Sequence, residues 1–358
     1  MQRKKIRALS LFSGSLASRI ASRLVEHFPN VEEIVLLYFR CPYFGGYERI
    51  REIVKEEWPG VYFRTQSLKK EYRRLANIAP EGYFSLGSAC LSCRTIMLSH
   101  AARYMERIGA DCIVTGEVMG KNGLFEKEML QIEEALGISG LVLRPLSGRL
   151  LPATKAERAG KIDRSALGSL TVDDSAELAN IGARLGLLSA DGLPTEVRCK
   201  LTSHQFGTRL EDLLGERGFN ISSLKLLDFA LYYKLPPDVK IVVAKNEEEK
   251  RMLQNFFLPN DLRVYLPIRG GSMTLVRANW AMKSQAKIEE IIEIASRITA
   301  THSETVRRSS MQVNYRFESD DETLQLSVFP FSSEKEICDY CCVPVSPYVG
   351  SRESLVRS

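Results

Sequence analysis

The chain has 358 residues, and a prior of roughly 150 residues per domain predicts two or three domains. Its apolar content of 44%, charged content of 26% and net charge of +5 are ordinary for a soluble globular protein and compatible with RNA as a partner. No apolar run reaches the roughly 18 residues of a membrane span, and the N-terminus lacks a long signal-peptide core. These values argue against a membrane protein and favour a cytoplasmic location, in which the eight cysteines stay reduced.

The first 150 residues alternate apolar strands with helical patterns. Strands are predicted at 6–12, 33–39, 61–63, 111–114 and 140–144, and helices at 16–28, 47–58, 94–108 and 126–136. Strands separated by helices of this length are typical of parallel βαβ units. The predicted fold class is therefore α/β, a doubly wound and mostly parallel sheet with helices on both faces.

Four polar or small residues follow the ends of predicted strands, namely Ser13, Cys41, Thr115 and Pro145. In a doubly wound sheet, ligands bind beyond the carboxyl ends of the strands. These four residues are therefore predicted to cluster at one rim of the sheet.

The second half of the chain has a different pattern, with strands predicted at 240–244, 262–266, 313–317 and 324–329 and helices at 247–257 and 286–299. This pattern predicts a smaller α+β domain. The predicted divisions are a nucleotide-binding domain at 1–214, the α+β domain at 215–330 and a flexible tail at 331–358.

The segment Ser13-Gly14-Ser15-Leu16-Ala17-Ser18 joins the first strand to the first helix. Such a junction presents backbone N–H groups and a helix N-terminus to an anion. The segment lacks the Gly-Lys-Ser/Thr ending of a Walker loop but resembles the PP-loop of ATP pyrophosphatases, Ser-Gly-Gly-x-Asp-Ser. Ser15 stands where the family has glycine and Ala17 where it has aspartate. Taken alone, the segment could equally be a βα turn without a ligand.

Further segments make the resemblance more specific. Residues 110–117 (Ala-Asp-Cys-Ile-Val-Thr-Gly-Glu) look like a strand and turn of tRNA thiouridine synthases. Residues 143–147 (Leu-Arg-Pro-Leu-Ser) and 150–154 (Leu-Leu-Pro-Ala-Thr) are similar to a bacterial branch of that family. Residues 90–93 (Cys-Leu-Ser-Cys, before a helix) and 199–202 (Cys-Lys-Leu-Thr) match the same branch in the same order. The likeness covers about residues 6–214.

The region of about 215–317 resembles a small NFACT-type RNA-binding domain that is fused to these proteins. The sequence Asn246-Glu247-Glu248-Glu249, after the strand at 240–244, carries this likeness. The alternative is a generic α+β domain.

The resemblance implies an ATP-dependent tRNA sulfurtransferase that adenylates a uridine and then inserts sulfur. It implies ATP and Mg²⁺ as cofactors, and tRNA and a sulfur-donor protein as partners. The residues that would bind the nucleotide are Ser13, Gly14, Ser15, Ser18, Thr115, Gly116 and Glu117.

Cys90 and Cys93 have the spacing of a metal chelate or a redox couple. In sulfur-inserting enzymes that this chain resembles, such a pair and one distal cysteine hold a 4Fe-4S cluster with one open iron, which implies Cys90, Cys93 and Cys199 as metal ligands. In a persulfide version of the chemistry, Cys199 and Cys93 are the catalytic residues, and Arg198 and Lys200 could lower the pKa of Cys199. The remaining alternative is that Cys90 and Cys93 are half-buried small residues.

The other cysteines are interpreted as structural. Cys41 follows a strand, and Cys112 lies inside an apolar one. The group Cys338, Cys341 and Cys342 lacks a second pair or a nearby histidine that would complete a zinc site.

Several departures leave rival functions open. The family's Gly-Gln-Arg-Pro-Met-Ser stretch is reduced here to Gly120, followed by Lys121, which could neutralise phosphate. The basic run at 69–74 suits an RNA backbone or a solvated helix face. The rivals are a catalytically degenerate relative that acts as an RNA- or nucleotide-binding module, and an adenylating enzyme for a small molecule.

Overall fold

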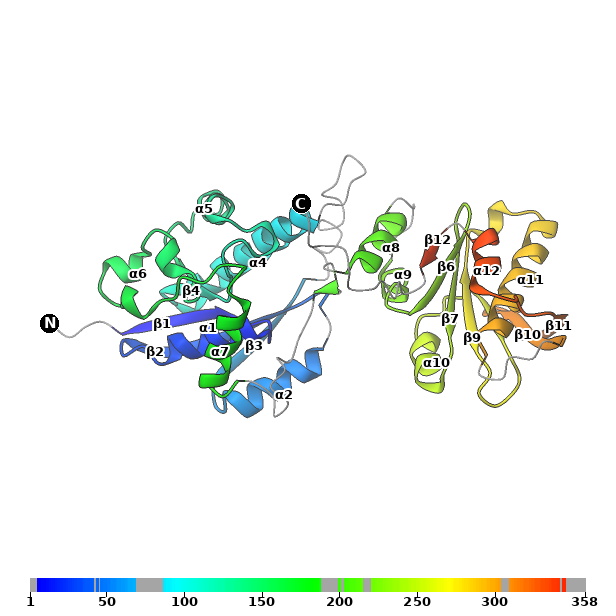
Figure 1. Cartoon of the computed structure of the whole chain (residues 1–358), viewed down its shortest axis with the longest axis horizontal. Coiled ribbons are helices and arrows are strands. Elements are labelled where there is room, and N and C mark those ends of the chain that lie inside the picture. The colour runs from blue at the N-terminus through cyan, green and yellow to red at the C-terminus, as the bar shows by residue number, and fades with distance from the viewer. Residues whose placement is uncertain are drawn as a thin grey trace. The chain divides into compact units, whose positions relative to one another are not determined.

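The computed structural model describes residues 5–41, 43–44, 46–68, 86–187, 199–200, 203–214, 220–303, 309–341 and 343–345. The chain divides into two compact units, Met1–Ser203 and His204–Ser358, which are described separately (Figure 1). Within the described ranges, no helix is long and apolar enough to cross a membrane.

The first unit contains a five-stranded sheet in the order β3-β2-β1-β4-β5, and every neighbouring pair is parallel. The strands are β1 (Ile6–Leu11), β2 (Val31–Arg40), β3 (Tyr62–Ser67), β4 (Cys112–Thr115) and β5 (Val142–Leu143). The helices are α1 (Leu16–Glu26), α2 (Tyr47–Glu57), α4 (Leu86–Ile108), α5 (Glu126–Ala135), α6 (Lys155–Arg158) and α7 (Ser175–Arg184). This topology confirms the predicted α/β class.

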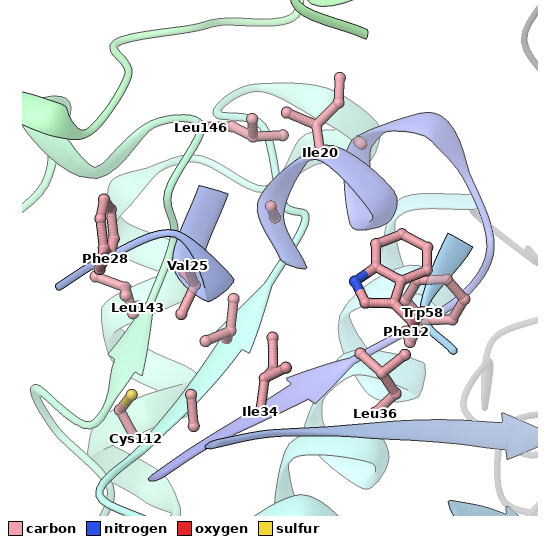
Figure 2. Close-up of a cluster of buried hydrophobic side chains, with 14 of the residues drawn as sticks. Phe12, Ile20, Val25, Phe28, Ile34, Leu36, Trp58, Cys112, Leu143 and Leu146 are labelled. Atoms are coloured by element: carbon pink, nitrogen blue, oxygen red, sulfur yellow. The ribbon is translucent and has the colours of Figure 1, made fainter. Parts of the chain in front are cut away.

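Both faces of this sheet are buried. On one face α1 and its neighbours cover a core in which the ring of Phe12 lies edge-on to Trp58 at 5.0 Å, and Cys112 belongs to the same core (Figure 2). On the other face Leu98 and Met105 of α4 pack on β1 and β2. Burial on both faces explains the continuous apolar runs of the strands, and it confirms the structural interpretation of Cys112.

Helix α4 begins earlier than the sequence pattern predicts. The CxxC pair was placed before a helix starting at residue 94, but α4 starts at Leu86 and contains both Cys90 and Cys93. The added turns are held by tertiary packing, because Leu91 packs against the small core formed by Leu124 and Met129. The two cysteines therefore lie one turn apart on the same side of a helix.

The second unit contains a seven-stranded sheet in the order β11-β10-β8-β9-β7-β6-β12, with only antiparallel neighbours. The strands are β6 (Leu231–Leu235), β7 (Val239–Ala244), β8 (Leu262–Tyr265), β9 (Met273–Arg277), β10 (Met311–Phe317), β11 (Leu324–Val328) and β12 (Val343–Val345). The helices are α8 (His204–Leu214), α9 (Ile221–Leu226), α10 (Glu247–Gln254), α11 (Gln285–Thr301) and α12 (Glu334–Tyr340). Helix α11 covers the sheet through Ile291, Ala295 and Ile298.

The limits of the second unit differ from the sequence-based divisions at 214 and 330. Helix α8 belongs to this unit because the buried guanidinium of Arg209 donates to the carbonyls of Leu227 and Phe229. Ordered structure also continues past residue 330. There Ile337 of α12 is fully buried in the core, and β12 pairs with β6. Strands β6, β9 and β12 were absent from the sequence prediction.

Candidate functional site

The central feature of the first unit is the junction between β1 and β4, where the chain order of the strands reverses. The segments that follow these strands are residues 13–18 and the turn at Gly116 and Glu117. They are in direct contact, because a Cβ atom at Gly116 would lie 2.5 Å from the backbone nitrogen of Ser18. The geometry therefore brings the predicted phosphate loop and the Thr115-Gly116 turn together, at the place where doubly wound sheets bind ligands.

The phosphate loop leads into the N-terminus of α1 and contains Gly14 in a left-handed conformation, with φ of 76°. Its serines bind one another. The hydroxyl of Ser15 accepts a hydrogen bond from the Ser18 N–H at 3.4 Å and lies 2.9 Å from the hydroxyl of Ser13. Ser18 Oγ donates to the Ser15 carbonyl at 2.9 Å. Ser15 is thus the N-cap of α1 and occupies one of the N–H groups that an anion would use.

Glu117 lies in a buried ion-pair network. Its carboxylate accepts from Nε of Arg144 at 2.7 Å and from the hydroxyl of Thr115 at 3.1 Å, and Arg94 is 3.3 Å away. Arg144 also donates to Glu133 of α5. Burial acts to raise the pKa of the Glu117 carboxyl, but the guanidinium groups of Arg144 and Arg94 outweigh it and lower that pKa. The structure gives Glu117 the role of joining β4, β5, α4 and α5, and its contact with a nucleotide stays a prediction.

Arg94 connects this network to the cysteine pair. Its side chain is about one third exposed, and its positive charge acts to lower the pKa of both Cys90 and Cys93. Burial outweighs that effect and raises the pKa of Cys90, and it raises the pKa of Cys93 to about 12. Cys93 is therefore a thiol at neutral pH, and Cys90 is half-buried.

Cys41 and Cys199 lie at the same rim. The backbone N–H of Lys200 donates to the carbonyl of Tyr43 at 2.9 Å, and Cys199 forms an antiparallel bridge with Phe44. Both Cys41 and Cys199 are close enough to act electrostatically on the Cys93 thiol. The structure therefore brings the distal cysteine to the CxxC pair and adds Cys41, which sequence reasoning assigned a structural role. The only sequence signal for Cys41 was its position just past a strand end.

The arrangement of these side chains does not fit a metal centre. Among the residues that the structure describes, no group of three or more histidine, cysteine, aspartate or glutamate side chains is placed to hold a metal ion. Cys90, Cys93 and Cys199 are neighbours without forming a ready-made ligand set. A cluster on these three cysteines stays a prediction that this geometry does not support.

Pro145 lies at the same rim, and the other predicted residues are elsewhere. Pro145 follows β5, and its carbonyl accepts from Gly168. Lys121 is exposed in a short 3-10 helix, and Cys341 is buried in the core of the second unit beside the half-buried Cys338. Arg198, Cys342 and the basic run at 69–74 lie outside the described residues.

Residues 232–341 match the family described as NFACT protein RNA binding domain. The match runs from β6 to the end of α12, so it covers most of the second unit. No curated protein matches the chain.

Several solved structures are similar to the chain. A predicted subunit of a tRNA methyltransferase from Methanocaldococcus jannaschii is 17% identical with a TM-score of 0.31, over 39% of this chain and 69% of that one. The C-terminal part of a fibronectin/fibrinogen-binding protein from Streptococcus suis is 11% identical with a TM-score of 0.27, over 76% and 98%. A U34-tRNA thiolase from Methanococcus maripaludis with its 4Fe-4S cluster is 14% identical with a TM-score of 0.33, over 59% and 66%. Likenesses this distant carry no argument about activity.

Proposed function

We propose that the chain is an ATP-dependent tRNA sulfurtransferase whose first unit activates and thiolates a uridine and whose second unit binds the RNA. One observation carries the proposal. The phosphate loop, the Thr115-Gly116 turn and the thiols of Cys93 and Cys199 lie at one end of one parallel sheet, inside one compact unit. The match of residues 232–341 to an RNA-binding domain family supports RNA as the substrate.

In the first step ATP binds with its phosphates on the N–H groups of residues 13–18, with Mg²⁺ balancing their charge. Gly14 allows the backbone to turn, and the Ser15 hydroxyl must release the Ser18 N–H before that group can bind phosphate. The carbonyl oxygen of the uridine attacks the α-phosphorus and releases pyrophosphate. Adenylation is required because a carbonyl oxygen is a poor leaving group.

In the second step a sulfur-donor protein leaves a persulfide on Cys199, which is half-buried at the rim. The outer sulfur attacks the adenylated carbon and expels AMP, which links the base to Cys199 through a disulfide. The thiol of Cys93 then attacks the Cys199 sulfur, and its proton leaves with the thiolated base. The products are thiouridine and a disulfide between Cys93 and Cys199, which a dithiol reductant returns to two thiols.

A catalytically degenerate RNA-binding relative is the second candidate, and the phosphate loop favours it. The hydroxyls of Ser13, Ser15 and Ser18 bind one another, and Ser15 caps α1 without a ligand. Such a loop is stable without phosphate. Ala17 also lacks the carboxylate that the PP-loop pattern carries at this position.

The test uses the full chain with bulk tRNA, Mg²⁺ and a persulfide donor. We expect tRNA-dependent ATP–pyrophosphate exchange and a thiolated nucleoside detected by mass spectrometry. Cys199→Ser should abolish thiolation and keep exchange, because adenylation needs no sulfur. Cys338→Ser, a half-buried cysteine of the second unit, is the matched control and should change neither reaction.

Tight tRNA binding without exchange or thiolation would contradict the sulfurtransferase and support the binding module. Exchange that proceeds equally well without tRNA, with a small acceptor instead, would also contradict it.

A further inference from the structure

Two of the four cysteines at the rim are buried and two are half-buried. Cys41 and Cys93 are each 6% exposed, whereas Cys90 and Cys199 are of intermediate exposure. The proposed sulfur chemistry uses Cys199 and Cys93 and leaves Cys41 without a role.

The fold places Cys41 and Cys93 at the same level of the sheet. Helix α4 connects parallel strands, so it runs antiparallel to β2. It is fixed to β2 by the ring of His100, whose centroid lies 6.3 Å from that of Phe39. Cys93 lies seven residues before His100, about 10 Å nearer the helix N-terminus and on the same face. Cys41 lies two residues after Phe39, about 7 Å nearer the carboxyl rim and on the same side of the strand.

A second set of contacts connects Cys41 to Cys199. The N–H of Phe44 donates to the Cys41 carbonyl at 3.0 Å, and Phe44 in turn bridges Cys199. The segments at 41–44 and 199–200 therefore run together. Cys41 and Cys199 are both close enough to Cys93 to act electrostatically on its thiol.

We propose that Cys41 and Cys93 form a buried dithiol–disulfide couple, which receives oxidising equivalents from the more exposed Cys199. The couple needs no sulfur transfer, because any low-molecular-weight disulfide that reacts with Cys199 can start it. Sulfur transfer, as proposed above, is a second source, since it ends in a disulfide between Cys93 and Cys199.

The relay has three exchange steps. Cys199 loses its proton and attacks an external disulfide, forming a mixed disulfide and releasing one thiol. Cys93 attacks the Cys199 sulfur, forms the Cys93–Cys199 disulfide and releases the second external thiol. Cys41 then attacks the Cys93 sulfur, so that the Cys41–Cys93 disulfide forms and Cys199 becomes a thiol again. In total Cys41 and Cys93 lose two electrons and two protons, and the external disulfide gains them.

The burial of Cys41 and Cys93 favours transfer of the disulfide from Cys199 to this pair. A disulfide is uncharged and apolar, so burial does not penalise it. Both Cys41 and Cys93 are only 6% exposed, so a disulfide between them is shielded from external reductants.

The experiment oxidises the reduced full chain with oxidised glutathione, followed by acid quenching, alkylation, trypsin digestion and mass spectrometry. Trypsin places Cys41 in peptide 41–49, Cys90 and Cys93 together in 75–94, and Cys199 in 199–200. We expect 41–49 linked to 75–94. Cys90→Ser should keep this link, which assigns it to Cys93. Cys41→Ser should replace it with a link between 75–94 and 199–200.

Cys199→Ser should slow formation of the Cys41–Cys93 link about tenfold, because the buried thiols are then oxidised directly. Circular dichroism and thermal unfolding of the reduced variants show whether each one folds. A wild-type end product linking Cys93 to Cys199 or to Cys90, with Cys41 alkylated, would overturn the couple. So would one tightly bound iron or zinc ion that protects all four cysteines. An unchanged rate in Cys199→Ser would overturn the relay.

Discussion

The two units use their ion pairs differently. In the second unit Arg277 and Asp261 connect β9 to the loop before β8 at 2.6 Å, while Arg263 and Glu318 join β8 to the residues after β10 at 2.6 Å. These pairs hold neighbouring parts of an antiparallel sheet together. In the first unit the network around Arg144 lies at the carboxyl rim, beside the phosphate loop and the cysteines. In the first unit, the side chains that stabilise the fold therefore also border the candidate site. In the second unit, the pairs named above only hold strands and loops together.

The largest expected effect comes from Arg144→Met. The change removes the guanidinium that joins the buried carboxylates of Glu117 and Glu133, and breaking such a buried pair typically costs about 3–5 kcal/mol. Hydrogen exchange measured by mass spectrometry should show that β4 and β5 lose protection. The protection of β7 and β9 should stay unchanged. The exposed pair of Arg184 and Glu177 provides the control, since Arg184→Met should cost less than about 1 kcal/mol. Equal costs for the two variants would show that the rim network is not a strong constraint.

The second effect is a pH dependence of the second unit that comes from His302. Burial, with a contribution from Lys245, lowers the pKa of His302 to about 4, from an ordinary value near 6.5. The folded state therefore keeps this ring neutral while the unfolded chain takes up a proton. Stability should fall as the pH drops below about 6.5 and level off near 4, with a total loss of about 3 kcal/mol.

Hydrogen exchange in β6 and α11 between pH 7 and 4.5, corrected for intrinsic rates, measures this loss. Nε2 of His302 is hydrogen-bonded to Tyr233 Oη at 2.6 Å. The variant His302→Gln keeps a polar side chain beside Tyr233 but has no group that titrates in this pH range. If the stability of the wild type and of His302→Gln fell equally as the pH dropped, His302 would not be the cause of the pH dependence.

A third change, Gly116→Ala, tests the contact between the two loops of the first unit. The added methyl group overlaps the backbone of Ser18, so the phosphate loop must move, at a cost of about 1–3 kcal/mol. We expect the first unit to lose stability and ATP to bind more weakly, as measured by thermal unfolding with and without Mg-ATP. Gly207→Ala is the control, because an added methyl group in α8 meets no atom within 4 Å.

The smallest change in stability is expected for Ser15→Gly. Glycine is nearly as good an N-cap as serine, so the loss is a few tenths of a kcal/mol. Because the variant frees the Ser18 N–H, calorimetric titration with Mg-ATP should show tighter binding. Ser284 caps α11 in the second unit through the Lys287 N–H, and Ser284→Gly should cost the same without changing ATP affinity. Unchanged affinity in Ser15→Gly would mean that the serine cap does not compete with phosphate.

Much of the first unit could be predicted from the sequence, because the alternation of strands and helices is local information. The same logic placed Ser13, Cys41, Thr115 and Pro145 just past strand ends at one rim, and the strands that precede them are parallel neighbours in the structure. The partners of Arg144 could not be predicted, since Glu117 and Glu133 approach it only after β4, β5 and α5 assemble. Ser15 was interpreted as a lost glycine, and only the structure shows that it caps a helix.

The second unit was harder to interpret. Strands β6 and β9 were missed although both are buried, and the second unit extends beyond both predicted boundaries. Its sheet forms from pairings between distant segments, such as β12 with β6, which no local pattern encodes. A family match was therefore more informative there than periodicity.

The tight approach of Gly116 to Ser18 limits which substitutions this protein can accept during evolution. Any larger residue at 116 collides with the backbone, and loss of Glu117 removes one of the two carboxylates that pair with the buried Arg144 guanidinium. Selection for folding alone is enough to keep both residues, even in a descendant that has stopped using ATP. Ser15 and Cys199 are partly exposed, so packing constrains them less. Substitutions at such positions are therefore the ones that reflect a change in function.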